Sequence, residues 1–377
     1  MAEATTPTGS QPAGNGLARA AERLKLRSVL SSLILSSRFL PVWLATIALV
    51  IVAAIIAPAA LKSTSWAFVF PVMAVLAVAA LGAMLVIMQA GIDLSVPAVI
   101  FLGGNLILGV SEHSDERLWL GILACLGLGL LVGLSNGIFV GILRLNPLIV
   151  TLAVGGIVLA FGARYARQVS FETAVPPALR SWGLTKPLGI SWIFWLGVIL
   201  TIFVALCLRY TAPGRRFQAV GANPRAAWMA GIHVRSHVVF AYTAAGLLYG
   251  AAAVMLAGVR GSIDSSFGAE YLLAPIAAVV IAGASFSGGL ASVTSTWVAA
   301  LALTLLSQVL LVLGLSPAMQ FVVFGAAILA GMIVSGDRIA ALLGKVLQHP
   351  RARALFGVDR SLELDERRGP AETSAGG

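Results

Sequence analysis

The stretch MQAGIDLSVPAVIFLGGN, residues 88–105, places an aspartate, Asp93, between two long runs of apolar residues. A carboxylate in such apolar surroundings is costly unless other groups hold it. Ser95 and Pro97 follow directly, and Asp or Ser before a proline is typical of a helix start. The stretch therefore predicts two alternatives: Asp93 caps a helix that begins in or near a membrane, or it contacts a polar substrate or carries a proton.

The composition of the chain decides between a soluble and a membrane protein. Of its 377 residues, 59% are hydrophobic and only 11% are charged, with a mean hydropathy of +0.96. A soluble domain carries about a quarter charged residues. Several apolar runs approach or exceed ~20 residues, the length that a helix needs to cross the hydrocarbon core, and no alternation with a period of two residues indicates a barrel. We therefore expect an all-α integral membrane protein.

Ten apolar runs without Asp, Glu, Lys or Arg predict ten transmembrane helices. Their expected bounds are 39–61, 67–88, 96–110, 118–143, 147–163, 190–208, 238–257, 272–284, 291–314 and 318–334. Five runs precede the loop 164–189 and five follow it. Because five is an odd number, the second half is expected to be inverted relative to the first.

The two expected halves, 39–163 and 190–334, place the two shortest runs, the third and the eighth, in matching positions. Inverted repeats are common in transporters, and short spans in matching positions point to the binding region near the midplane. The repeat itself is faint in the sequence, where GIDLS at 91–95 corresponds to SIDSS at 262–266.

The basic residues predict how the helices are oriented. The net charge is +10, and the lysines and arginines lie in the connections between apolar runs, which favours a role in membrane topology over nucleic-acid binding. Most of them fall on one side if the N-terminus is cytoplasmic. The positive-inside rule therefore predicts that both termini are cytoplasmic.

The ends of the chain differ in composition from its middle. Residues 1–38 are polar and end in a basic stretch, so we expect a disordered cytoplasmic extension. Residues 39–336 form the expected transmembrane domain, and 337–377 a polar cytoplasmic tail. Cys125 and Cys207 each lie within an apolar run, where a small core residue is expected rather than a disulfide or a metal ligand.

The segment 209–237 is the longest internal connection between apolar runs, and it contains five arginines and no acidic residue. Its core, NPRAAWMAGI, predicts a short helix: Asn223 caps it, Pro224 occupies its first position, and Gly231 ends it. Such a helix at the membrane surface, with Trp228 available, would dock a partner. The alternative is a basic loop that only serves topology and lipid headgroups.

Four segments in this order closely resemble permeases of ABC transporters of the ribose, xylose and galactose type. The segments are GIDLSVPAV, NPLIVTLAVGGIVLAFGARY, GRRFQAVGANPRAAWMAGIHV and IAAVVIAGASFSGGLASV. This family belongs to a larger group that includes branched-chain amino-acid permeases. The resemblance covers about residues 40–336, and both tails lie outside it.

The resemblance implies roles for particular residues. The family's segment between the two halves resembles a Glu-Ala-Ala-x-x-x-Gly loop that contacts the ATP-binding subunit. That spacing is kept here, with an arginine in place of the glutamate, by Arg225, Ala226, Ala227 and Gly231. The family also has the Asp and Ser matched by Asp93 and Ser95, whereas Pro97 stands where a glycine is usual.

The resemblance also implies partners. It implies a homodimeric pore in the bacterial inner membrane, with two ATPase subunits below it and a periplasmic or extracellular protein that delivers sugar from above. The chain contains no G-x-x-x-x-G-K-[S/T] motif, since ALLGKVL at 341–347 lacks its first glycine and its hydroxyl residue. We therefore expect no cofactor in this chain, and ATP to be used by the partner subunit.

Few polar side chains lie at membrane depth, and these are the candidates for the substrate pathway. Asn105 on the short third run is the first candidate, and Asn136 on the fourth run is the second, beside Asp93 and Ser95. Three glutamines, Gln89, Gln308 and Gln320, occupy similar depths. The alternative for each is a hydrogen bond to a neighbouring helix.

A different class of function is also open, a secondary transporter or channel that uses Asp93 as its proton or cation site. Proton-coupled carriers usually contain more intramembrane ionisable groups than one aspartate, and they have no evident need for the capped basic helix of 209–237. An enzyme or a receptor is a more remote alternative. His233 and His237 have the i, i+4 spacing of metal ligands, but no carboxylate accompanies them, which favours a solvated loop. The identity of the solute does not follow from this chain.

Overall fold

The computed structural model describes residues 39–169, 173–289 and 291–334. The expected extension 1–38 and the expected tail 337–377 lie outside the described residues. Within the described residues the chain is helical, and the only β pairing is an isolated bridge between Ala174 and Ser262. The expectation of an all-α membrane protein is confirmed.

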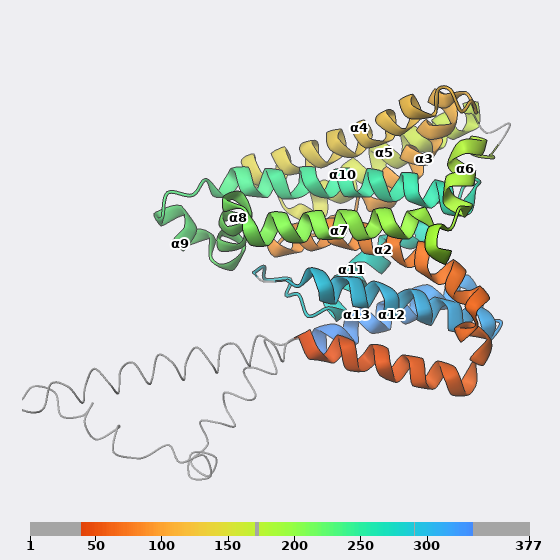
Figure 1. The fold of residues 1–377 in the computed structure, drawn as a ribbon. Helices are drawn as coiled ribbons and strands as arrows, with labels where there is room; N and C mark the ends of the chain where they lie inside the picture. The colour runs from red at the N-terminus through yellow and green to blue at the C-terminus, as the bar shows by residue number, and fades with distance from the viewer. Residues whose placement is uncertain (1–38, 170–172, 290, 335–377) are drawn as a thin grey trace, which may run out of the picture.

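The first half contains five apolar helices in the expected places. They are the helix Phe39–Ile56 (red in Figure 1), α2 Ser63–Met88, α3 Val96–Ser111, α4 Leu118–Gly137 with its π-helical continuation η2 Ile138–Ile142, and α5 Pro147–Val169. The 3-10 turn η1, Pro58–Leu61, joins the first two. Four of these five helices are long and apolar enough to cross a membrane, and α3, with 16 residues, is shorter.

The second half repeats this order. Its apolar helices are α7 Trp192–Tyr210, α10 Val234–Arg260, α11 Ala274–Ile281, α12 Val293–Val312 and α13 Pro317–Val334. The helix α11 has only eight residues. The prediction that the third and eighth spans are the shortest is therefore confirmed. Residues 285–289 contain a turn between α11 and α12, in which Gly288 and Gly289 have φ of +86° and +103°.

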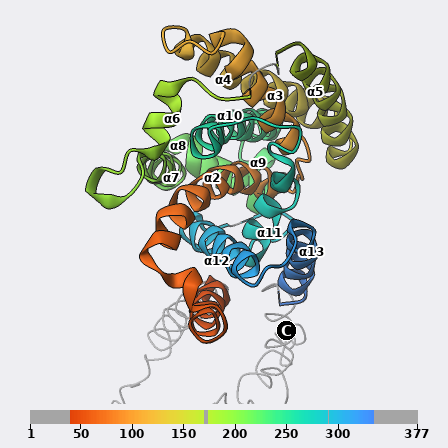
Figure 2. The ribbon, with the colours of Figure 1, turned by 90° about the vertical axis from the view of Figure 1, so that its right-hand side faces the viewer.

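The two halves pack around a central pair of helices. Viewed along the helix axes, α2 and α10 lie in the middle, with α3, α4 and α5 on one side and α11, α12 and α13 on the other (Figure 2). Each short helix packs against the long helix of the other half, α3 against α10 and α11 against α2. These reciprocal contacts are what two inverted repeats predict.

The contact between α4 and α10 depends on small residues. Gly129 and Gly133 on α4 lie against the backbone of Gly246 and Tyr242 on α10, so that an added Cβ at either glycine would overlap a carbonyl oxygen. Close approach of helices through small residues is typical of membrane proteins, where packing rather than water drives association. The glycines thus hold α10 in the centre of the molecule.

The two ends of the helix bundle carry different short helices. One end carries α8, Ala212–Ala222, and α9, Pro224–Met229, and we name it the α9 end (Figure 1). The opposite end carries α6, Pro177–Leu184, with the 3-10 turns η3, Pro187–Gly189, and η4, Ala269–Leu272, and we name it the α6 end.

Two helices at these ends do not follow from the hydropathy of the sequence. The helix α6 lies in the segment expected only as a loop, and α8 precedes the one short helix predicted in the basic connection. Both are short and carry polar as well as apolar residues. A search for long apolar runs therefore misses them, because their stability comes from packing of one face against the bundle.

Candidate functional site

The connection from α2 to α3 turns around the carboxylate of Asp93. Its Oδ1 accepts hydrogen bonds from the backbone N–H of Ser95 at 2.9 Å and from the Ser95 hydroxyl at 2.6 Å. Both residues are buried, with 3% and 1% of their surface exposed. The carboxylate thus forms a local turn just before α3. It is not a helix cap, because Ser95 rather than Asp93 occupies the N-cap position and no side chain there bonds to the first N–H groups of the helix. The capping interpretation of Asp93 is corrected to this turn.

Side chains of two further helices form hydrogen bonds with this turn. Asn136 on α4 donates from Nδ2 to the hydroxyl of Ser95 at 3.0 Å. Thr151 on α5 accepts a hydrogen bond from the backbone N–H of Leu94 at 3.1 Å. Three of the four predicted pathway residues, Asp93, Ser95 and Asn136, therefore form one buried cluster.

The cluster continues to the central helix α10 and leaves polar atoms without partners. Asp93 Oδ2 and Asn136 Oδ1 are buried and have no hydrogen-bond partner among the described residues, and the same holds for the hydroxyls of Tyr242 and Tyr249 on α10. The Tyr242 hydroxyl lies against Gly91 in the same connection, where an added Cβ would overlap it. The cluster is closed, and none of the pockets described below reaches it.

Asn105, the fourth predicted pathway residue, lies away from this cluster. It is buried on α3 and donates from Nδ2 to the carbonyl of Phe101 in its own helix at 2.8 Å. Gly104 beside it packs against Phe267. The structure therefore shows Asn105 in helix packing, and it stays a pathway candidate only as a prediction.

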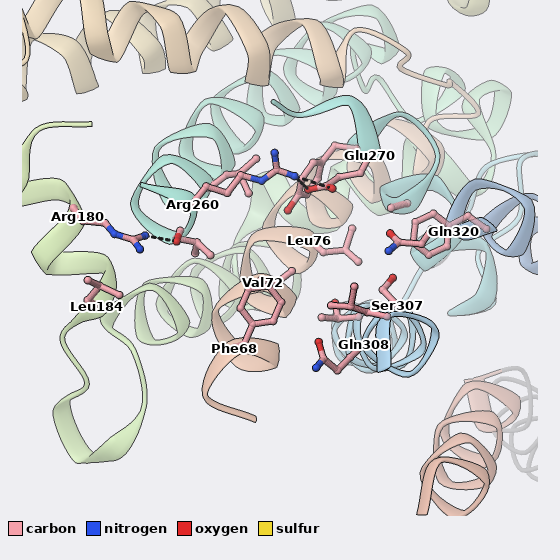
Figure 3. A pocket seen from close by; sticks show the side chains of 17 residues that line it. Phe68, Val72, Leu76, Arg180, Leu184, Arg260, Glu270, Ser307, Gln308 and Gln320 are labelled. Atoms are coloured by element: carbon pink, nitrogen blue, oxygen red, sulfur yellow. Dashed lines mark hydrogen bonds and ion pairs between the residues drawn. The ribbon is translucent and has the colours of Figure 1, made fainter. Parts of the chain in front are cut away.

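A pocket of about 520 Å³ opens at the α6 end between α2, α10, α12 and α13 (Figure 3). This volume lies in the range of about 300–1,000 Å³ that small-molecule sites occupy. Its polar lining includes Thr304, Ser307 and Gln308 on α12 and Gln320 on α13. Its opposite wall is apolar and includes Phe68 and Leu76 on α2.

Charged side chains stand at one side of the pocket. Arg260, the last residue of α10, pairs through Nη2 with both carboxylate oxygens of Glu270, each at 3.0 Å (Figure 3). Arg180 on α6 donates to the carbonyl of Val259 at 2.6 Å. This second guanidinium therefore binds the free carbonyls at the end of α10.

Sequence reasoning found only part of this pocket. It noted Gln308 and Gln320 as polar residues at membrane depth, but it did not bring them together, and it placed no role on Arg180, Arg260 or Glu270. A signal was present, since Arg260 and Glu270 flank the connection that leads to the shortest span. Their pairing depends on the path of that connection, which the spacing does not reveal.

The basic connection forms α8 and α9 at the α9 end. Asn223 caps α9 as predicted, accepting from the N–H of Ala226 at 3.0 Å. Pro224 is the first helical residue, and Gly231 has φ of +78° after the last turn. The predicted start and stop of this helix are thus confirmed.

The side chains of α9 divide between the protein and the outside. Trp228 and Met229 are 69% and 73% exposed, and Arg225, Ala226 and Gly231 are exposed as well. Ala227 is buried against the chain itself, with 5% of its surface exposed. Ala227 therefore seats the helix, whereas the large apolar side chains next to it face outward.

A second pocket, of about 1060 Å³, lies between α9, η2 and the start of α10. Three arginines line it together with His233, and these are Arg144, Arg225 and Arg235. No carboxylate is among its lining residues. The α9 end thus presents a basic groove beside two exposed apolar side chains.

The histidines and cysteines carry no sign of a metal site in the part of the chain that the structure describes. No three His, Cys, Asp or Glu side chains there are grouped so as to hold an ion. The ring of His237 is within 2.9 Å of the His233 carbonyl, a contact inside one helical turn. Cys125 and Cys207 are free, and Cys125 is fully buried.

Comparisons with known proteins agree with this arrangement. Residues 65–332 match the family of the branched-chain amino acid transport system, permease component. The chain is 33% identical to the galactofuranose transporter permease protein YtfT of Escherichia coli over 71% of this chain and 78% of that protein. It is 32% identical to the fructose import permease protein FrcC of Rhizobium meliloti (66% and 71%) and 30% identical to the ribose import permease protein RbsC of Escherichia coli (70% and 82%). No solved structure matches the chain.

Proposed function

This chain belongs to the family of permease components of the branched-chain amino acid transport system, and we propose that it is the membrane-spanning subunit of an ABC importer for a monosaccharide. It is a multi-pass inner-membrane protein and a transporter subunit rather than an enzyme. The relatives named for galactofuranose, fructose and ribose support a sugar as the substrate class.

The observation that carries this proposal is the structure of α9. A six-residue helix is too short to be stable alone, yet this one is capped at both ends and presents Trp228 and Met229 outward. Large exposed apolar side chains at a helix that projects from the membrane domain are typical anchors of a protein interface. The partner that an importer requires there is the ATPase, because this chain has no nucleotide-binding motif of its own.

The remaining partners follow from the same proposal. The basic groove beside α9 favours a cytoplasmic position for the α9 end, by the positive-inside rule. Both termini are then cytoplasmic, and the α6 end faces the sugar-binding protein. Four helices have mostly outward-facing surfaces, namely Phe39–Ile56, α4, α5 and α7. These surfaces are available to lipid and to a second copy of the chain in a homodimer.

A secondary transporter with Asp93 as its ion site has less support. The Asp93 carboxylate is bonded to Ser95 within a closed cluster rather than exposed in a pocket. Uptake by such a carrier would not require the α9 surface.

The proposal is tested by a charge placed on the exposed face of α9. Trp228→Glu and Met229→Glu are expected to keep the membrane abundance of the permease but to abolish co-purification with the ATPase and sugar uptake, because a buried unpaired charge costs several kcal/mol. The complete importer is expressed in cells, and pull-down and uptake are measured. Leu188→Glu is the matched control, since Leu188 is 90% exposed at the opposite end and its substitution should leave ATPase co-purification intact. Parental co-purification and uptake in both α9 variants would rule out α9 as the docking element.

A further inference from the structure

The pocket at the α6 end contains polar groups that the protein itself does not use. Thr304 is 5% exposed, and its hydroxyl has no hydrogen-bond partner among the described residues. Gln308 lies one turn further along the same face of α12, and the amide of Gln320 faces the pocket from α13 (Figure 3). A buried polar group without a partner costs about 1–3 kcal/mol, and this cost applies to the Thr304 hydroxyl. The amides of Gln308 and Gln320 are partly exposed to the pocket and available to a ligand.

The charged groups of the pocket are already engaged. The Arg260 guanidinium pairs with Glu270, and the Arg180 guanidinium binds the carbonyl of Val259. The neutral amides and hydroxyls that remain both donate and accept hydrogen bonds, and a ligand rich in hydroxyl groups matches them. The Arg180 guanidinium keeps its positive charge, since a carbonyl does not neutralise it, so an anionic group beside α6 would also be accepted.

The apolar wall of the pocket suits the same kind of ligand. Phe68 and Leu76 on α2 and Phe324 on α13 also line the pocket. A monosaccharide has hydroxyl groups at its edge and C–H groups on the faces of its ring. Small-molecule sites combine apolar walls with a few placed polar groups in this way.

The position of the pocket decides how a ligand reaches it. The lining residues come from the α6-end parts of α2, α10, α12 and α13. The α2 residues between the pocket and the α9 end, from Ala77 to Met88, are packed inside the protein, and we infer that a ligand enters from the α6 end.

We propose that this pocket is a monosaccharide-binding subsite within the permease, in which Thr304, Gln308 and Gln320 bind the sugar hydroxyls. The inference rests on the proposed import function, since it names the place where the delivered sugar first contacts the membrane domain. It does not depend on Asp93, Asn105 or Asn136, which lie outside the pocket.

Uptake by the complete importer tests the proposal. Radiolabelled D-ribose, D-fructose and D-galactose are the probes. Thr304→Val and Gln308→Leu should each raise the half-saturating sugar concentration for uptake, or lower the uptake rate, by about tenfold, the effect of one lost hydrogen bond to a ligand. Gln308→Asn should recover part of the loss. The control is Thr201→Val on α7, because the Thr201 hydroxyl binds the carbonyl of Gly197 in its own helix and does not line the pocket.

A labelling experiment separates a binding role from a structural one. Gln308→Cys should react with a membrane-impermeant maleimide added outside intact cells, and the transported sugar should slow this reaction. Parental uptake in both Thr304→Val and Gln308→Leu, or labelling that the sugar does not slow, would overturn the subsite. If the unmodified importer takes up none of the three probes, the proposed monosaccharide function is rejected as well, whereas normal uptake with unaffected variants rejects the subsite alone.

Discussion

The connections that lead into the two short helices are built on the same turn but lie in different surroundings. Before α3, Asp93 accepts from the N–H and the hydroxyl of Ser95 at 2.9 and 2.6 Å. Before α11, Asp264 accepts from the same two groups of Ser266 at 2.7 and 2.6 Å. The first turn is buried under α4, α5 and α10, and the second is exposed at the α6 end.

The difference shows that the turn and its surroundings have separate causes. Aspartate two residues before serine forms the turn through hydrogen bonds within three residues, whatever surrounds it. Whether the turn is buried or exposed depends on the path of the segment that follows it. Residues 89–95 lead directly into α3, whereas 261–273 include η4, which carries Glu270 and Tyr271 to the edge of the pocket. The second half thus has a pocket beside this connection, whereas the corresponding connection of the first half is buried.

Replacing the two aspartates should give the largest difference in stability between the two turns. Asp93→Leu is expected to destabilise the folded protein by about 3 kcal/mol or more, because it leaves the N–H and hydroxyl of Ser95 buried without an acceptor. Asp264→Leu should have little effect, since water replaces the lost bonds. Membrane abundance and the thermal stability of the detergent-purified protein measure the difference.

Asp93→Asn serves as the control for charge. Its side-chain carbonyl can still accept both bonds from Ser95, so we expect near-parental abundance and uptake. Well-expressed Asp93→Asn without uptake would contradict a purely structural role of Asp93 in the turn and favour a proton or substrate role for the carboxylate.

Exchanging Gly91 and Ser262, which lie two residues before Asp93 and Asp264, should have a smaller effect. Gly91→Ser introduces the residue found at the matching position, Ser262, but its Cβ would overlap the Tyr242 hydroxyl. We expect a loss of about 1–3 kcal/mol in stability, as for other overpacked cores. Ser262→Gly should cost less, and Tyr242→Phe should recover part of the Gly91→Ser loss. Thermal stability of Gly91→Ser, Ser262→Gly and the double variant with Gly91→Ser and Tyr242→Phe tests this order, and equal losses in the two connections would contradict it.

The smallest effect on stability is expected from the titration of the Asp264 carboxylate in the exposed turn. The hydrogen bond from the Ser266 hydroxyl lowers the pKa of Asp264 below its ordinary value, and the nearby Arg260 charge adds to this shift. A lowered pKa in the folded state means that the ionised carboxylate stabilises the turn above the ordinary aspartate range, about pH 4. This contribution is lost as the pH falls through the lowered pKa.

Asp264→Asn should therefore reduce stability slightly near neutral pH and not at all at the acidic end. The difference in melting temperature between this variant and the parent is measured from pH 7 to pH 3 in detergent. A difference that grows as the pH falls would contradict the assignment, and exposure to water keeps the whole effect small.

Much of this protein was determined by its sequence alone. The lengths of the apolar runs predicted the ten helices, including the two short ones, because crossing the hydrocarbon core requires about 20 apolar residues. Asn223, Pro224 and Gly231 predicted α9, since caps act on backbone groups within one turn. The strings at 91–95 and 262–266 showed only a faint repeat, and the structure shows that each forms the same turn.

Only the tertiary structure decided which polar residues act together. Asn136 reaches Ser95 because α4 packs beside α3, whereas Asn105 on the same α3 bonds to its own helix. The pocket joins Thr304, Gln308 and Gln320 to residues of α2 that lie far away in the sequence. Burial and pairing depend on which helices become neighbours, and that choice arises from contacts along the whole length of the helices rather than from the residues beside each group.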